Sequence, residues 1–147
     1  MEFISRATAV LLLVGLSPLL LIVGLGNLII QGRPIIYRQK RVGKHFKEFF
    51  IYKFRTMHND DAGVNTFSAG QIITLTKWGR FLRKTKIDEL PQLFNIIKGD
   101  MRFIGPRPEI PEYVSKESFS FLNIIKPGLS GFSFFARYSR IRLYSKS

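Results

Sequence analysis

The stretch VLLLVGLSPLLLIVGL, residues 10–25, decides the fold because it is apolar over enough residues to enter a lipid bilayer. Residues 7–31 contain no charged side chain, and about 20 apolar residues suffice for a helix to cross a hydrocarbon core. A cleavable secretory signal is the first alternative, with Arg6 as its basic start and the small residues around Gly24 as a cleavage site. The apolar run continues through residues 28–30, however, which favours a retained membrane segment.

Ser17 and Pro18 interrupt this run near its centre. Proline lacks a backbone N–H and clashes with the preceding turn, so a helix should kink or break here, and the Ser17 hydroxyl can satisfy a freed carbonyl. The break fits either a kinked spanning helix or a re-entrant hairpin. General insertion rules favour the spanning helix. The basic cluster at residues 33–47 places that flank in the cytoplasm, and a re-entrant segment would keep Arg6 there as well.

The composition indicates how many domains to expect and which kinds of partner are favoured. The chain has 147 residues, 46% of them hydrophobic, and its 23 Lys and Arg against 10 Asp and Glu give a formal net charge of +13. This length is typical of one domain, and the charge favours anionic partners such as nucleic acid, acidic lipid headgroups or phosphorylated substrates. The absence of cysteine excludes disulfides, thiolate metal sites and a cysteine nucleophile. We therefore expect a membrane segment at 1–32 and one catalytic domain at 33–147.

Patterns beyond the membrane segment predict an α+β fold that is mainly helical. Residues 35–37 and 49–52 are β-branched and aromatic runs, which predict a small strand pair. Residues 58–70 are polar and predict a loop.

An amphipathic helix is predicted over residues 75–86, where apolar side chains recur at helical spacing among basic ones. Its aromatic face, with Trp78 and Phe81, suits either a membrane interface above anionic headgroups or an ordinary protein core. The pattern leaves both alternatives open.

A second helix is predicted over residues 90–97, where Pro91 suits a first turn and Gly99 supplies a stop. Asp88 and Glu89 then lie at a helix N-terminus. Backbone N–H groups and the helix dipole keep a carboxylate ionised there, ready to act as a nucleophile or a metal ligand. Acidic residues at a helix start are also routine capping residues, so the local pattern alone does not decide between capping and catalysis.

Several cations are candidates for binding an anionic substrate. Residues 105–108 read GPRP, and the two prolines stiffen the backbone around Arg107, whose guanidinium can clamp phosphate with two parallel hydrogen bonds. A surface turn with an exposed arginine is the alternative. Lys53, Arg55 and the Lys126 segment add further candidate anion contacts.

Taken together, these segments resemble the bacterial sugar transferase family, the small monotopic phosphoglycosyl transferases. The resemblance covers nearly the whole chain, in order and in spacing. It rests on Ser17-Pro18 in the apolar segment, YKFRTM at residues 52–57, KIDELPQLFNIIKGDM at 86–101, GPRP at 105–108 and KPGLSG at 126–131.

The resemblance implies a specific reaction and a re-entrant helix broken at Ser17-Pro18. Asp88 is then the nucleophile that attacks the β-phosphorus of a UDP-sugar, UMP leaves, and a phosphosugar stays bound to Asp88, with Glu89 in support. The phosphate of polyprenol phosphate attacks this intermediate and gives a polyprenyl-diphosphate sugar, the first lipid-linked intermediate of a surface glycan. Mg²⁺ is implied as cofactor, with Asp88 as a ligand. The residues expected to contact substrate are Lys53, Arg55, Arg107, Pro108 and Lys126.

The resemblance also implies partners and a location. The expected partners are a UDP-sugar, polyprenol phosphate, anionic membrane lipids and, in a homodimer, a second copy of the chain; nucleic acid is not expected. The expected location is the bacterial inner (cytoplasmic) membrane, with the catalytic part facing the cytosol.

The sequence departs from the family pattern after residue 131. FSFFAR follows where the family usually has Trp-Ala-Gln-Val-Asn-Gly-Arg, and the sequence ends at Ser147, before a further helical region that such proteins usually carry. This predicts a catalytic domain shortened at its C-terminus. Two alternative functions therefore stand beside the enzyme: an inactive truncated remnant, and a non-catalytic basic membrane protein that binds anionic lipid.

Overall fold

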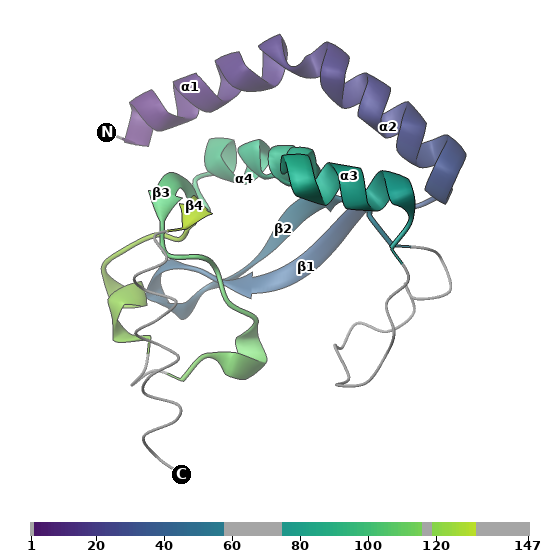
Figure 1. Cartoon of the computed structure of the whole chain (residues 1–147). Coiled ribbons are helices and arrows are strands. Elements are labelled where there is room, and N and C mark those ends of the chain that lie inside the picture. Colours follow the sequence, from purple (N-terminus) through teal and green to yellow (C-terminus); the bar gives the residue numbers. More distant parts are fainter. Residues whose placement is uncertain (1, 58–74, 116–118, 132–147) are drawn as a thin grey trace.

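The computed structural model describes residues 2–57, 75–115 and 119–131 and combines helices with small sheets. A bent pair of N-terminal helices arches over a layer that holds α3 and α4, and the strands β1 and β2 lie beneath that layer (Figure 1). The predicted loop at 58–70 and the C-terminal departure from the family pattern after residue 131 lie outside the described residues. The elements are α1 (Glu2–Gly15), α2 (Ser17–Gln31), β1 (Ile36–Val42), η1 (Lys44–Phe46), β2 (Glu48–Phe54), α3 (Lys77–Thr85), η3 (Ile87–Gln92), α4 (Leu93–Lys98), β3 (Arg102–Gly105), η4 (Pro111–Tyr113), η5 (Ser120–Asn123) and β4 (Gly128–Gly131).

The break predicted at Ser17 and Pro18 is confirmed. α1 ends at Gly15, α2 begins at Ser17, and the two helices are bent by 61°. Ser17 Oγ donates a 2.7 Å hydrogen bond to the carbonyl of Val14, as expected where proline removes a backbone donor. Among the described helices, none alone has the length and apolar character needed to cross a membrane, whereas the bent pair together does.

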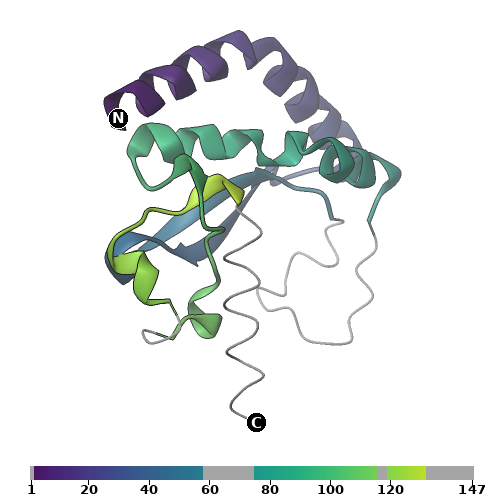
Figure 2. The same cartoon turned by 60° about the vertical axis from the view of Figure 1, so that its left-hand side comes forward.

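Both arms of the helix pair pack on the rest of the chain. Ala9 of α1 is fully buried in a cluster with Leu93 and Ile96 of α4. Val23 of α2 packs in a second cluster with Phe54 and Leu82. Figure 2, turned by 60°, again shows the helix row beneath the arch, so the N-terminal segment is part of the folded unit.

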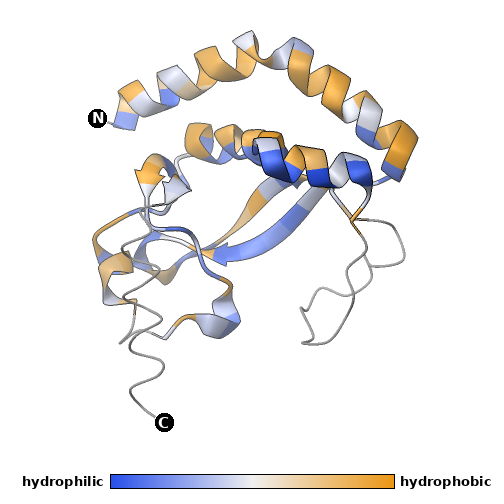
Figure 3. Ribbon diagram, viewed as in Figure 1, coloured by the Kyte–Doolittle hydropathy of each residue, from blue (hydrophilic) through white to orange (hydrophobic). Residues whose placement is uncertain are grey.

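The outer face of the helix pair is apolar and exposed. Figure 3 shows hydrophobic residues along both helices, where a soluble surface would be polar. The exposed fraction is 74% for Leu11, 65% for Ile22 and 82% for Ile29. An exposed apolar patch of this extent is typical of a surface that meets a membrane or a partner.

The predicted strand pair is confirmed, and the second helix has two parts. β1 and β2 pair antiparallel, with Gln39 opposite Ile51. The predicted helix at 90–97 starts as the 3-10 helix η3 and continues as α4, because Pro91 has no N–H for an α-helical bond. Gly99 ends α4 in a left-handed conformation with φ 87°, the role predicted for it.

The two aromatic residues of α3, Trp78 and Phe81, differ in whether they pack in the core or face outward. Trp78 packs against the cluster around Val23, and its Nε1 donates a 2.8 Å hydrogen bond to Oδ1 of the fully buried Asn27. Phe81 stacks on Trp78 at 5.7 Å between ring centroids but stays 49% exposed. One aromatic residue therefore belongs to the core, and the other lies at the surface.

Candidate active site

Asp88 and Glu89 occupy the first turn of η3, directly after α3. Lys86 adopts a left-handed conformation with φ 60° between α3 and η3, which turns the chain so that η3 lies against β2. Asp88 is 6% exposed, and Glu89 is half-buried. The dyad therefore lies at a helix start, as predicted, although the helix is a 3-10 turn.

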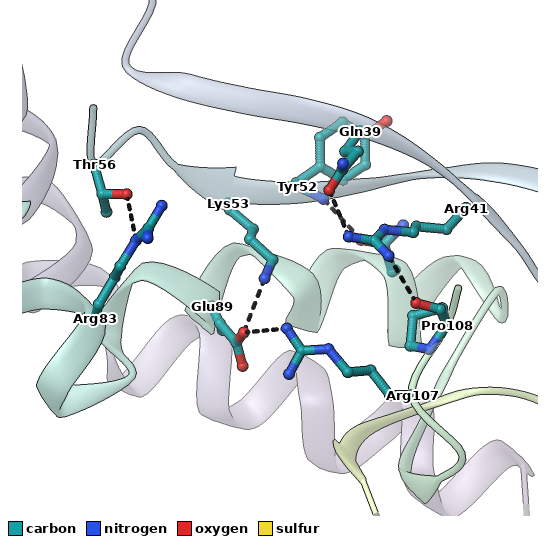
Figure 4. Close-up of polar contacts among 10 residues, drawn as sticks. Gln39, Arg41, Tyr52, Lys53, Thr56, Arg83, Glu89, Arg107 and Pro108 are labelled. Atoms are coloured by element: carbon teal, nitrogen blue, oxygen red, sulfur yellow. Dashed lines mark hydrogen bonds and ion pairs between the residues drawn. The ribbon is translucent and has the colours of Figure 1, made fainter. Parts of the chain in front are cut away.

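Glu89 joins two of the predicted cations. Lys53 Nζ of β2 lies 2.9 Å from Glu89 Oε1, and Arg107 Nη2 lies 3.7 Å from the same oxygen (Figure 4). Burial alone would raise the pKa of Glu89, but the hydrogen bond and charge of Lys53, followed by the charge of Arg107, hold this pKa below its ordinary value. Glu89 is thus ionised, holds Lys53 closely and makes a looser ion pair with Arg107.

Asp88 has the opposite electrostatic setting. Burial, and then the negative charge of Glu89, raises the pKa of Asp88 above its ordinary value, while Lys53, Arg83 and Lys86 partly offset the rise. Its Oδ1 is buried and has no hydrogen-bond partner in the part of the chain that the structure describes. A carboxylate oxygen in such a position is available to an electrophile or a cation.

Arg83 is a site residue that our sequence reasoning missed. It lies in the last turn of α3, where the pattern showed only a basic helix face. Its Nε donates a 2.9 Å hydrogen bond to Thr56 Oγ1, and its charge acts on Asp88 (Figure 4). Arg83 is an exposed residue whose charge acts on Asp88, so it is a candidate to contact an anion bound there. A basic last turn only a few residues before a carboxylate pair was the available signal.

The GPRP and KPGLSG motifs are joined backbone to backbone. β3 and β4 pair in parallel, and the N–H of Gly128 donates a 2.9 Å hydrogen bond to the carbonyl of Pro106. Gly105 and Gly128 lie so close that a Cβ on either would collide with the other's backbone. Glycine is therefore required at both positions. Pro108 is buried, and its carbonyl accepts a hydrogen bond from Arg41.

Arg55 and Lys126 lie in other contacts. Arg55 is 3% exposed and donates through Nη1 to the carbonyl of Arg33 and through Nη2 to that of Gln31, between α2 and β1. Lys126 Nζ lies 2.9 Å from Oε1 of Glu2 at the start of α1. The structure therefore brings Lys53 and Arg107 to the dyad, while substrate contacts by Arg55 and Lys126 stay predictions.

The dyad can hold a magnesium ion in the manner usual for phosphate chemistry. Within the described residues there is no group of three His, Cys, Asp or Glu side chains that could form a closed metal site. Mg²⁺ in phosphoryl-transfer sites is bound by one or two carboxylates together with substrate phosphates and water. The unpaired Oδ1 of Asp88 beside the carboxylate of Glu89 fits that donor set.

Comparisons with known proteins place this site in a family. Residues 2–146 match the model of the bacterial sugar transferases. The chain is 36% identical over 136 residues to the UDP-glucose:undecaprenyl-phosphate glucose-1-phosphate transferase of Xanthomonas campestris pv. campestris, covering 88% of this chain and 28% of that protein. It is 38% identical over 123 residues to the UDP-N-acetylgalactosamine-undecaprenyl-phosphate N-acetylgalactosaminephosphotransferase of Aeromonas hydrophila, covering 80% and 29%.

A third relative, the undecaprenyl-phosphate galactose phosphotransferase of Salmonella typhimurium, is 38% identical over 119 residues, or 69% of this chain and 25% of that protein. The chain thus matches less than a third of the length of each of these relatives. The family model nevertheless matches this chain from the bent N-terminal helix pair through the dyad and both glycine motifs. The chain therefore belongs to the bacterial sugar transferase family.

Proposed function

We propose that this protein transfers a sugar phosphate from a UDP-sugar to polyprenol phosphate, with Asp88 as the nucleophile. The observation that carries the proposal is the buried Oδ1 of Asp88, which has no hydrogen-bond partner among the described residues and lies beside the ionic group of Lys53, Glu89 and Arg107. The relatives' names describe sugar-phosphate transfer to undecaprenyl phosphate, which supports the same reaction class here.

The transfer takes two displacements at one phosphorus. A carboxylate oxygen of Asp88 attacks the β-phosphorus of the UDP-sugar, the bond from that phosphorus to the bridging oxygen breaks, and UMP leaves with the electron pair. The sugar phosphate is then an acyl phosphate on Asp88. A phosphate oxygen of polyprenol phosphate attacks the same phosphorus, and the Asp88 carboxylate is released. Covalent catalysis of this kind divides one difficult displacement into two easier ones.

The surrounding cations make the first attack feasible. An anionic carboxylate is repelled by phosphate oxygens, so positive groups must offset that repulsion where charge develops. Lys53 is held beside the dyad by Glu89, Arg107 lies within 3.7 Å of the same carboxylate, and Arg83 lies on the α3 side. When Mg²⁺ is bound at Asp88 and Glu89, it supplies further neutralisation of the diphosphate. The raised pKa of Asp88 also makes its ionised form a stronger nucleophile.

The helix pair supports a re-entrant placement in the bacterial inner membrane, with the site facing the cytosol. Glu2 at the start of α1 pairs with Arg102 at 3.1 Å and with Lys126 at 2.9 Å, so the N-terminal end lies on the same domain as the end of α2. A spanning helix would separate these ends by a bilayer. The apolar outer face then enters one leaflet, and the acceptor phosphate reaches the dyad at headgroup level.

The deciding experiment measures UMP release by the protein in lipid nanodiscs that contain polyprenyl phosphate, over a panel of UDP-sugars. We expect release with at least one sugar, and loss of release in Asp88→Asn. Full turnover by Asp88→Asn would refute the nucleophile assignment. Asp100→Asn, which alters an aspartate of the turn after α4, is the matched control and should stay active.

The alternatives predict other outcomes of the same experiment. A blank result across the panel would favour the inactive remnant. A non-catalytic lipid-binding protein would release no UMP, and its binding to anionic vesicles would fall with salt and be insensitive to Asp88→Asn.

A further inference from the structure

Arg107 is aimed at the dyad mainly by its backbone. Its side chain is 59% exposed, and its ion pair with Glu89 is loose at 3.7 Å between Nη2 and Oε1. An ion pair at this distance with one partner largely exposed does little to fix a long side chain, since ion pairs near the surface contribute at most about 1 kcal/mol. The direction of Arg107 therefore depends on how the flanking residues are fastened.

Hydrogen bonds to their carbonyl oxygens hold Pro106 and Pro108, the residues on either side of Arg107. Pro106 and Pro108 have no backbone N–H, so only their carbonyl oxygens can be held by hydrogen bonds. The carbonyl of Pro106 accepts from the N–H of Gly128 at 2.9 Å, on the β4 side. The carbonyl of Pro108 accepts from Arg41 Nη1 at 3.1 Å, on the β1 side. Arg107 lies between these two attachment points.

Arg41 reaches its acceptor from a braced position near the end of β1. Its Nη2 donates a 2.6 Å hydrogen bond to Gln39 Oε1 while Nη1 holds Pro108, as Figure 4 shows. The next residue, Val42, donates its N–H to the carbonyl of Glu109 at 2.9 Å. The end of β1 therefore binds two successive carbonyls, those of Pro108 and Glu109. Burial and the charge of Arg107 lower the pKa of Arg41, while the carboxylates of Glu109 and Glu112 partly offset this. Within the described residues, its hydrogen bonds go to Gln39 and Pro108.

We infer that Arg41 is a positioning residue of the transfer reaction: by holding the Pro108 carbonyl, it directs Arg107 toward Glu89 and the substrate diphosphate. A planar guanidinium can serve the two acceptors Gln39 and Pro108 at fixed angles, which an ammonium group cannot do. This inference rests on the proposed function, because it assigns Arg41 a role only through Arg107 in that reaction.

A double-mutant cycle on UMP release tests whether Arg41 acts through Arg107. We expect Arg107→Met to lower kcat by about 100-fold, as for loss of one charge-stabilising group. Arg41→Met should lower kcat by about tenfold, as for a misplaced group, with little change in the KM for the UDP-sugar. In the Arg107→Met background, Arg41→Met should cost less than about twofold, because the residue it positions is gone.

Three further variants sharpen the result. Arg41→Lys keeps the positive charge but lacks the planar guanidinium that serves two acceptors. Its kcat should therefore fall as much as that of Arg41→Met. Arg38→Met, three residues before Arg41 and on the exposed face of β1, is the matched control and should keep the wild-type rate. Gln39→Ala removes only the brace and should give a smaller loss that is likewise absent beside Arg107→Met; it decides the question if Arg41→Met does not fold.

The outcomes separate this inference from the proposed function. Equal losses from Arg41→Met in both backgrounds, or a fully active Arg41→Lys, would overturn the positioning role while leaving the transferase intact. A wild-type protein that releases no UMP with any sugar would overturn both.

Discussion

Lys53 of β2 and Glu89 of η3 are 36 residues apart in sequence, yet Nζ of Lys53 donates a 2.9 Å hydrogen bond to Oε1 of Glu89. Both side chains are mostly buried, with 17% and 16% exposed, so solvent screens this pair less than a surface pair. The contact ties the strand pair to the start of the helix that carries Asp88 and Glu89. It also keeps a cation beside Asp88, the proposed nucleophile.

Lys53→Met should remove this cation and strongly reduce UMP release. Glu89 then keeps only its looser pairing with Arg107, and the substrate diphosphate loses a neutralising charge. We expect kcat at neutral pH to fall by about 100-fold, as for loss of one electrostatic group in other active sites. Lys40→Met is the matched control, because Lys40 pairs with Glu48 at the surface with half of each side chain exposed. A similar loss in both variants would contradict the assignment.

The pH dependence of kcat/KM should report the ionisation of Asp88. The nucleophile acts as the anion, so the rate should rise with pH through the pKa of Asp88. Burial and Glu89 raise that pKa, and the acid limb should therefore lie above the ordinary aspartate range near about 3.9. Lys53 lowers this pKa, so Lys53→Met should move the limb to higher pH. An acid limb that stays in place or moves to lower pH would speak against this prediction.

Asn95 should be essential for stability. It is fully buried on α4, where Nδ2 donates to the carbonyl of Phe50 at 2.7 Å and Oδ1 accepts from the N–H of Tyr52 at 3.3 Å. Asn95→Ala leaves both backbone groups of β2 buried without these partners. We expect the free energy of unfolding in detergent to fall by about 2 to 4 kcal/mol. The exposed Asn123→Ala serves as control and should change it by less than about 0.5 kcal/mol.

Cysteine labelling should reveal the re-entrant topology, since the chain has no cysteine of its own. We expect Phe3→Cys and Tyr113→Cys to react with a membrane-impermeant maleimide only from the cytosolic side. Leu21→Cys, 68% exposed on the outer face of α2, should be protected in membranes and react in detergent. Labelling of Phe3→Cys from the opposite side would establish a spanning helix instead.

Local patterns were sufficient where one residue type imposes the geometry. Pro18 predicted the break, short β-branched and aromatic runs predicted β1 and β2, and Gly99 predicted the end of α4, because each depends on backbone sterics within a few residues. The helix start beside Asp88 and Glu89 was also predicted, although the predicted helix covered residues 90–97 and η3 already begins at Ile87. The 3-10 form of η3 was missed, although Pro91 carried the physical reason for it.

The grouping of the cations was beyond local patterns. Arg55 lies in the same YKFRTM stretch as Lys53, yet one residue binds the carbonyls before β1 and the other binds Glu89. Which of two nearby cations faces the dyad depends on strand twist and on the packing of η3. Arg83 and Arg41 were missed for a related reason, since their acceptors, Thr56 and Pro108, lie far away in the sequence.

The contact between Gly105 and Gly128 has a consequence for how such chains diverge. In most packed pairs, a larger residue on one side can be accommodated by a smaller one on the other, and the two positions change together. Here each position excludes a side chain because of the other's backbone, which no substitution can shrink. Each of the two positions should therefore keep glycine on its own, without a compensating change at the other. A search for correlated substitutions would miss this contact, although it is one of the tightest in the fold.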